Sequence, residues 1–144
     1  MKIFFDTNIL VYSYDNSDEL KHINAFNLIS NSIFKESIVI SSQVVNEFIV
    51  IMTTKVKHPI TIDEAAKFIT KFKINFEIRE TQMEDIEKAI LLHKNHKFSY
   101  WDSLIIATAI NVGAEILYSE DLQHGRIINN LKIINPFQKG LSQK

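Results

Sequence analysis

Four acidic residues stand beside strongly apolar segments spread over almost the whole chain: Asp6, Glu47, Asp102 and Asp121. A carboxylate among core-forming residues is costly to desolvate unless a positive charge compensates it. Two like charges about 4 Å apart repel by roughly 4 kcal/mol at an effective dielectric of about 20, so several acids in one crevice need a cation or protons. Oxygen ligands without cysteine or histidine suit Mg²⁺ or Mn²⁺. The four acids therefore predict one shared metal site.

Each acid also has an ordinary structural explanation. Asp6 can cap the helix that follows its strand, and Asp102 can complete a capping box at the start of its own helix. Glu47 can be an exposed helix position, and Asp121 or its neighbour Glu120 can be a turn residue. These explanations are independent of one another, whereas a common site accounts for all four positions together.

The elements that must position these acids alternate between strands and helices. The predicted strands are apolar throughout instead of alternating with polar residues, which is typical of a parallel sheet covered by helices on both faces. The sequence therefore predicts an α/β fold in three layers, with a mainly parallel central sheet of four or five strands flanked by helices. The predicted strands span residues 2–6, 37–41, 76–79, 115–118 and 132–134.

Helix signals fill the segments between the strands. Ser42 is expected to cap the helix that carries Glu47, and capping-box spacing is present at residues 61–64 and again at 81–84. Gly113 is well placed to end a helix over residues 99–112. A helix over residues 18–34 is predicted from apolar residues at helical spacing. These are Leu20, Ile23, Phe26, Ile29 and Ile33.

In open parallel sheets, ligands bind beyond the carboxyl ends of the strands. Asp6, the pair Ser41-Ser42 and the segment Ser119-Glu120-Asp121 all follow predicted strands at those ends. The first and the last lie more than a hundred residues apart in the chain. A parallel sheet nevertheless brings them to the same edge, which is where the metal site is expected.

Composition sets the broad class. A chain of 144 residues, 46% of them apolar, is expected to form a single domain over residues 1–144. It contains no cysteine, no apolar run long enough for a membrane helix and no secretory signal at its start, so we expect a cytoplasmic protein. The net charge of −1 neither favours nor excludes nucleic acid, because a local basic patch is enough for backbone contacts.

Four segments together resemble the motifs of the PIN domain family, and most closely those of the VapC-type toxin ribonucleases. They follow that family's order and spacing, and the resemblance spans nearly the full chain. The segments are IFFDTN (residues 3–8), SQVVNEF (42–48), YWDSLI (100–105) and YSEDL (118–122).

The resemblance implies metal-dependent cleavage of RNA phosphodiester bonds. By motif position, Asp6, Glu47, Asp102 and Asp121 match the family's acidic metal ligands, with Mg²⁺ or Mn²⁺ as the ion. The ion is expected to lower the pKa of a bound water and to neutralise the scissile phosphate. The first three acids are expected to hold the principal ion, while Asp121 orients the attacking water or completes a second site. The supporting residues that match are Asn8 and Ser119.

Contacts to RNA and to partners form a second group of expectations. Lys55, Lys57, Lys97 and Arg126 follow or precede the acidic motifs and are candidates for the RNA backbone, although each can equally be a solvated surface residue. Trp101 is expected to pack inside and fix the helix of Asp102. The resemblance further implies a homodimer and a small antitoxin partner whose helix fits a groove near the site.

Two other readings compete with a ribonuclease. A haloacid-dehalogenase-like phosphatase also begins with a strand that ends in Asp, but its chemistry needs a second Asp where Asn8 stands. A non-catalytic RNA-binding or scaffolding PIN module would keep the fold without turnover. The presence of all four acids weighs against this module, and an assay of RNA cleavage distinguishes the two.

Overall fold

Short strands alternate with helices along the chain, as the sequence predicts. The computed structural model describes residues 1–138 of the chain. Its elements are β1 (Lys2–Phe5), α1 (Thr7–Tyr14), α2 (Glu19–Ser32), β2 (Ser37–Ser41), α3 (Ser42–Thr54), α4 (Ile62–Asn75), β3 (Glu77–Arg79), α5 (Met83–Asn95), α6 (Tyr100–Asn111), β4 (Ile116–Tyr118), β5 (Ile127–Ile128) and β6 (Leu131–Ile134).

The strands form one sheet in the order β3-β2-β1-β4-β6-β5. Neighbouring strands pair in parallel, except that β5 runs antiparallel to β6. The predicted mainly parallel sheet is confirmed, and all five predicted strands are present. The extra strand β5 is only two residues long and joins β6 through a tight turn in which Asn129 has a positive φ of 54°. So short a strand leaves almost no pattern in the sequence.

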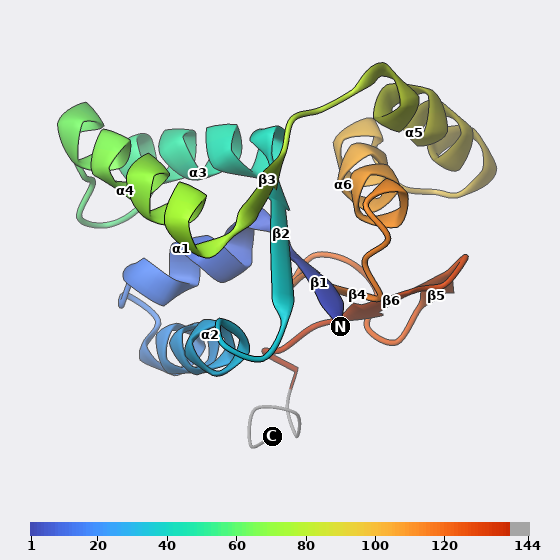
Figure 1. Cartoon of the computed structure of the whole chain (residues 1–144). Helices are drawn as coiled ribbons and strands as arrows, with labels where there is room; N and C mark the ends of the chain where they lie inside the picture. The colour runs from blue at the N-terminus through green and yellow to red at the C-terminus, as the bar shows by residue number, and fades with distance from the viewer. Residues whose placement is uncertain (139–144) are drawn as a thin grey trace.

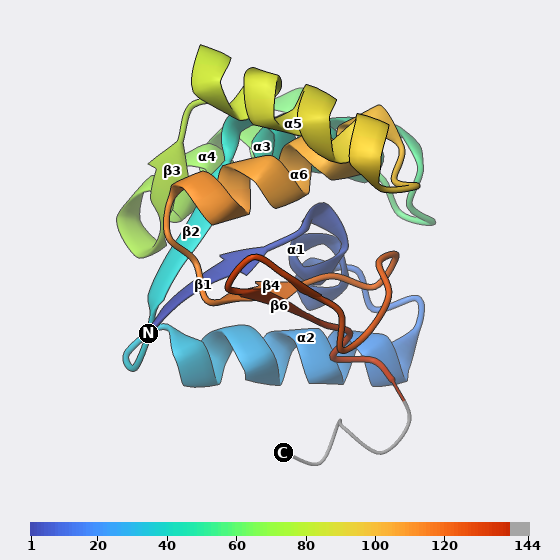
Figure 2. The same ribbon diagram turned by 90° about the vertical axis from the view of Figure 1, so that its right-hand side faces the viewer.

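The helices cover both faces of the sheet. Helices α1 to α4 lie on one side of β2 and helices α5 and α6 on the other (Figure 1). In the turned view, α5 and α6 lie side by side above β1, β4 and β6, while α2 lies below them (Figure 2). The strand order explains this division, because right-handed crossovers from β1 to β2 to β3 step one way and the crossover to β4 returns over the opposite face.

The central strands lie in the middle of the core, between the helices that also contribute to it. Phe4, Phe5, Val39, Ile40 and Leu117 have no exposed surface, because β1, β2 and β4 carry helices on both faces. This double burial is the reason why these strands are apolar at consecutive positions. None of the helices within residues 1–138 combines the length and the apolar character needed to cross a membrane.

Two predicted helix caps are displaced by one residue. The cap of α3 is Ser41, whose hydroxyl accepts from the N–H of Val44 at 3.3 Å. Ser42, the predicted cap, instead accepts from the N–H of Thr81 at 2.9 Å and so ties α3 to the segment after β3. Helix α5 begins after Gln82, so the capping box predicted at residues 81–84 is wrong by one position. The Thr81 hydroxyl instead contacts the Ser42 hydroxyl and so joins this segment to α3.

The other predicted box is confirmed. The N–H of Thr61 donates to Glu64 at 3.0 Å and the N–H of Glu64 donates to the Thr61 hydroxyl at 3.1 Å. Both hydrogen bonds lie at the start of α4, where backbone donors have no partner within the helix.

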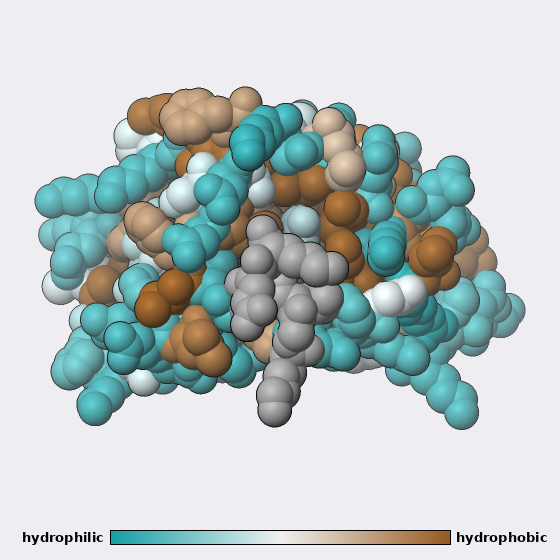
Figure 3. Space-filling view, turned by 90° about the horizontal axis from the view of Figure 1, so that it is seen from below, coloured by the Kyte–Doolittle hydropathy of each residue, from teal (hydrophilic) through white to brown (hydrophobic). Residues whose placement is uncertain are grey.

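Helix α2 is confirmed, but its apolar residues divide between core and surface. Ile29 and Ile33 pack against the core, whereas Leu20, Ile23 and Phe26 are exposed. Figure 3 shows the molecule from below, which is the side on which α2 lies in Figure 1. On this face, small brown apolar groups alternate with larger teal polar areas. The exposed residues form one strip along α2, because their spacing of three places them on one face.

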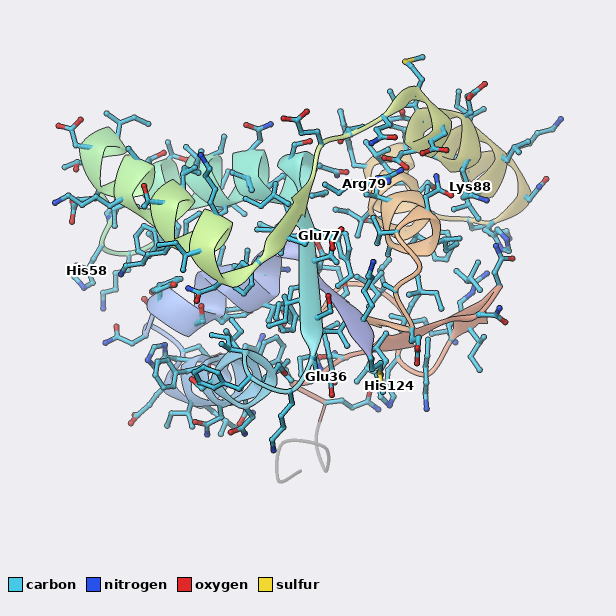
Figure 4. The ribbon with its side chains drawn as sticks, viewed as in Figure 1. Glu36, His58, Glu77, Arg79, Lys88 and His124 are labelled. Carbon is cyan, nitrogen blue, oxygen red and sulfur yellow. The ribbon has the colours of Figure 1, made fainter. Side chains whose placement is uncertain are left out.

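A buried acid joins β3, α5 and α6. The carboxylate of Asp85 is fully buried and accepts from Nε and Nη2 of Arg79 at 3.2 and 2.8 Å. It also accepts from Nδ2 of Asn111 at 2.8 Å and from the N–H of Gln82 at 3.0 Å. Burial alone would raise the pKa of Asp85, but these hydrogen bonds outweigh burial and lower it. Arg79 is the last residue of β3 and lies on the side towards α5 and α6 (Figure 4).

Replacing Arg79 with Met is therefore expected to destabilise the fold by about 3–5 kcal/mol, because it leaves the Asp85 charge buried without its cation. Urea unfolding at neutral pH measures the change. Lys88→Met, which removes a positive charge with no ion-pair partner among residues 1–138, is the matched control on α5 and should stay within about 0.5 kcal/mol. A loss below about 1 kcal/mol for Arg79→Met would contradict the expectation.

Candidate metal centre

Asp6 follows β1 directly and is almost completely buried, with 8% of its surface exposed. Its N–H donates to the carbonyl of Tyr118 in β4 at 3.0 Å. Its Oδ1 accepts from the N–H of Thr7 at 2.7 Å, so Asp6 caps α1. Its Oδ2 accepts from the hydroxyl of Ser119 at 2.7 Å. The ordinary capping role and a position at the site are therefore compatible.

The environment of Asp6 opposes its ionisation. Burial raises the pKa of the Asp6 carboxyl to about 6, although the hydrogen bonds from Ser119 and Thr7 act in the opposite direction. The negative charges of Glu47 and Asp121 raise this pKa further. An acid buried beside two other acids is the arrangement that a bound cation relieves.

Glu47 lies on α3 and is held from two sides. Its Oε1 accepts from the Thr7 hydroxyl at 2.7 Å and its Oε2 accepts from Nε2 of Gln43 at 3.3 Å. The same Nε2 donates to the carbonyl of Trp101 at 3.1 Å. Gln43 thus connects the second acid of the site to the first turn of α6.

The amide orientation of Gln43 follows from its two partners. A carboxylate and a carbonyl both accept hydrogen bonds, so the NH₂ group must face them. The remaining oxygen, Oε1, is buried and has no hydrogen-bond partner among residues 1–138. The contacts to Glu47 and to α6 are therefore made at the expense of one unsatisfied acceptor.

The last two acids complete the group. Asp102 is the third residue of α6, where its N–H donates to the capping hydroxyl of Ser99 at 3.1 Å. Asp121 follows β4 and accepts from Nδ2 of Asn8 at 2.8 Å. Burial raises the pKa of Asp121, and the charges of Glu120 and Asp102 add to this shift.

All four acids line one cavity of about 410 Å³ at the carboxyl edge of the sheet. It lies at the end of β1, where the strand order reverses: β2 lies on one side of β1, and β4 lies on the other. Such a point is the usual place for a ligand in open parallel sheets. The remaining walls come from α1, α3 and α6. The lining residues are Asp6, Thr7, Asn8, Gln43, Asn46, Glu47, Val50, Ile51, Lys55, Asp102, Ile105 and Asp121.

Thr7 and Gln43 were not foreseen as site residues, although α3 contains a signal that points to one of them. Gln43, Glu47, Ile51 and Lys55 are spaced by four residues and line the same cavity. Such spacing places side chains on one face of a helix. Once Glu47 is assigned to a site, the residues four before and four after it are the first candidates to join it.

The donor chemistry of the cavity fits a hard divalent cation. Its acidic side chains offer only oxygen atoms, and two of the four have raised pKa values that a positive charge would bring down. Within residues 1–138, no three acidic or histidine side chains already stand close enough together to hold an ion. The residues therefore match the ion in type and charge, but their side chains are not arranged as a closed coordination shell.

Glu120, the acid next to Asp121, is engaged elsewhere. It accepts from the Tyr12 hydroxyl at 2.9 Å and forms an ion pair with Lys21. Lys21 also lies 5.1 Å from the centre of the Tyr12 ring. These contacts tie the turn after β4 to α1 and α2, while Asp121 lines the cavity.

The predicted RNA-contacting residues are placed differently from one another. Lys55 lines the cavity at the end of α3. Lys57 and Lys97 are exposed and lie outside the cavity lining. Arg126 lies 2.9 Å from Nδ1 of His96, and its guanidinium covers the Phe98 ring at 4.5 Å. Arg126 therefore holds the turn after β4 against the loop before α6.

The expectation that Trp101 packs inside is wrong, because 62% of its surface is exposed. The buried positions of α6 are instead the seven consecutive residues 103–109. A helix with so long a buried run gives no periodic signal to show which of its apolar residues points outward. Trp101, at its second position, lies outside that run.

The solved structures with similar folds include several toxins. VapC20 of Mycobacterium tuberculosis, described as a sarcin–ricin loop cleaving toxin, is 18% identical over 83% of this chain and 89% of its own, with a TM-score of 0.64. VapBC2 of Rickettsia felis, bound to promoter DNA, is 21% identical over 92% and 97%, with a TM-score of 0.64. A toxin–antitoxin complex of Klebsiella pneumoniae is 18% identical over 94% and 98%, with a TM-score of 0.68.

At these identities, the similar structures establish the fold. The sequence has no significant match among curated proteins. The model of the PIN domain matches residues 3–128, which is most of the chain and includes all four acids. The chain therefore belongs to the PIN domain family.

Proposed function

We propose that this protein is a metal-dependent endoribonuclease and the toxin of a toxin–antitoxin pair. The observation that carries the proposal is the lining of one cavity by Asp6, Glu47, Asp102 and Asp121, which come from four separate segments. Membership of the PIN domain family and the structural likeness to a toxin that cleaves an RNA loop support the same activity.

In this proposal, Asp6, Glu47 and Asp102 hold a divalent ion, Mg²⁺ or Mn²⁺. The ion supplies Lewis acidity towards a water molecule and charge neutralisation at the scissile phosphate. Ser119 and Thr7 fix the orientation of Asp6 through hydrogen bonds to both of its oxygens. Such partners of metal ligands typically change activity by about 10- to 100-fold when they are lost.

The remaining residues of the cavity act on water and substrate. Asn8 donates to one oxygen of Asp121, and we assign to Asp121 the role of orienting the attacking water or completing a second ion site. Lys55 offers a positive charge to the RNA backbone on the α3 side of the cavity. We assign weaker backbone contacts to the exposed Lys57 and Lys97, and a holding role to Arg126.

An antitoxin partner fits the exposed apolar strip of α2, formed by Leu20, Ile23 and Phe26. A helix of a small partner can cover such a strip with its own apolar face. The similar structures from Rickettsia felis and Klebsiella pneumoniae are of toxin–antitoxin complexes. We further propose a homodimer that works in the cytoplasm.

Asp6→Asn is expected to lower the rate of RNA cleavage by at least about 100-fold, because it removes a ligand oxygen charge while keeping the shape of the side chain. Gel assays of RNA cleavage with Mn²⁺ or Mg²⁺, and then with EDTA, measure the effect, and EDTA should abolish cleavage. Glu115→Gln, an exposed acid at the opposite end of β4, is the control and should keep full activity. Cleavage that survives Asp6→Asn or EDTA would refute the proposal, and RNA binding without cleavage would favour the non-catalytic module.

In the absence of metal, the free energy of unfolding is expected to depend on the protonation of Asp6. Its pKa is raised from 3.8 to about 6, so the folded state binds the proton more tightly than the unfolded state. Stability is therefore lost as pH rises through this range, by up to about 3 kcal/mol at pH 7.5. In EDTA, we expect Asp6→Asn to be more stable than the unaltered chain at pH 7.5 but not at pH 4.

Urea unfolding of both chains at the two pH values tests this expectation without any reference to activity. Glu115→Gln again serves as the control, because Glu115 is exposed and its removal should add no pH dependence of this kind. Equal stability of the unaltered chain and Asp6→Asn at pH 7.5 would show that burial does not hold the proton on Asp6.

A further inference from the structure

Trp101 is the one tryptophan of the chain, and 62% of the surface of this residue is exposed. A tryptophan side chain is usually well covered, because it carries more apolar surface than any other residue. Its position is equally unusual, since it immediately precedes Asp102 in the first turn of α6. The exposed ring therefore belongs to the residue next to one of the four acids of the cavity.

Trp101 is not itself among the lining residues of that cavity, but it lies next to two of them on α6 and its carbonyl contacts a third, Gln43. Asp102 and Ile105 both line the cavity. Trp101 is four residues before Ile105, so the two side chains lie on the same face of the helix. Side chains lean towards the amino end of a helix, and Trp101 is one turn closer to that end. Its ring is therefore expected where the cavity wall formed by Ile105 meets the solvent.

The backbone carbonyl and the ring of Trp101 each have one contact within the domain. The carbonyl of Trp101 accepts from Gln43, the residue that also donates to Glu47. The ring packs edge to face against Tyr100, with centroids 5.5 Å apart and planes at 72°. A ring held in this way loses little conformational freedom when something stacks on it.

We infer that Trp101 is a stacking platform for a nucleobase of single-stranded RNA whose scissile phosphate lies at the acidic cavity. This rests on the proposed function. Single strands present unpaired bases with open faces, whereas a duplex keeps its bases stacked inside. Lys55, on the α3 side of the same cavity, supplies the positive charge that the adjoining phosphate needs. The class of substrate is thus unpaired RNA, with little selection among bases at this position.

Trp101→Ala is expected to weaken the binding of single-stranded RNA by about 5- to 150-fold, because stacking on an aromatic side chain contributes that range per base. The effect should fall on KM more than on kcat, since the ring holds the substrate and does not touch the reacting atoms. Trp101→Phe keeps a flat ring and should recover part of the loss. Met83→Ala, which truncates another side chain with 70% of its surface exposed, is the control and should change neither quantity.

The fluorescence of the single tryptophan reports on the ring directly in the unaltered chain. The titration uses Ca²⁺ in place of Mg²⁺ or Mn²⁺ and an eight-nucleotide single-stranded RNA of mixed sequence. The same RNA annealed to its complement and an abasic oligomer of equal length serve as comparisons. We expect saturable quenching by the mixed-sequence single strand, but not by the duplex or by the abasic oligomer. Because this titration uses the unaltered chain, it tests the inference even if Trp101→Ala fails to fold.

The outcomes separate this inference from the proposed function. Cleavage of RNA by the unaltered chain, with no quenching and an unchanged KM in Trp101→Ala, would overturn the inference and leave the nuclease standing. Quenching by single-stranded RNA without cleavage under any ion would support the platform and overturn the nuclease. Fluorescence that responds to protein concentration but not to RNA, with a lower oligomer mass for Trp101→Ala, would assign the ring to a protein interface and overturn the inference.

Discussion

The burial of one carboxylate, that of Asp6, is the constraint on which the rest of this structure depends. It closes β1, caps α1 and accepts a hydrogen bond from Ser119 after β4, so a single side chain joins three segments at one edge of the sheet. This junction opposes ionisation strongly enough to raise the pKa of Asp6 to about 6. The same junction brings Asp121 next to α1, where Asn8 reaches it. The acidic cavity is therefore a consequence of how β1, β4 and α1 meet at this edge of the sheet. The clustering of negative charge is the unfavourable part of that arrangement.

The parts of the fold that could be predicted from the sequence are those with a strong local cause. Apolar runs such as residues 3–5 and 38–40 predict buried strands because both faces of a parallel strand are covered. The cap of α3 was placed one residue late, because Ser41 and Ser42 are adjacent hydroxyls and only tertiary contact with Thr81 shows which one caps. Leu20 and Phe26 were grouped with the apolar side of α2, yet both are exposed. Spacing identifies a helix, but it does not say how much of its apolar face the domain covers.

The candidate site divides in the same way. That the four acids lie at one cavity could be predicted from the sequence, because each follows a strand or lies on a helix beside apolar residues. Thr7 could not, since its role is a hydrogen bond to Glu47 on another helix, and such a contact leaves no pattern along the chain, whereas Gln43 is marked by its spacing of four residues from Glu47 on α3. Trp101 was misplaced for a different reason. The run of buried residues after it makes α6 apolar nearly all round, so its exposed position shows no periodic signal.

Helix α6 shows how an arrangement with unfavourable parts is kept rigid. Its first turn is fixed to α3 by Gln43, which contacts the carbonyl of Trp101. Its last turn is fixed to α5 by Asn111, which donates to the buried Asp85 and so joins the ion pair with Arg79. Because both ends are tied, Asp102 keeps its position in the acidic cavity although its charge and that of Asp121 repel each other. Three locally unfavourable features lie near this edge of the sheet: an unsatisfied amide oxygen, a buried acid and an exposed indole. The hydrogen bonds around them are satisfied. Such a distribution is typical of a site selected for binding and chemistry, since these features bring no stability of their own.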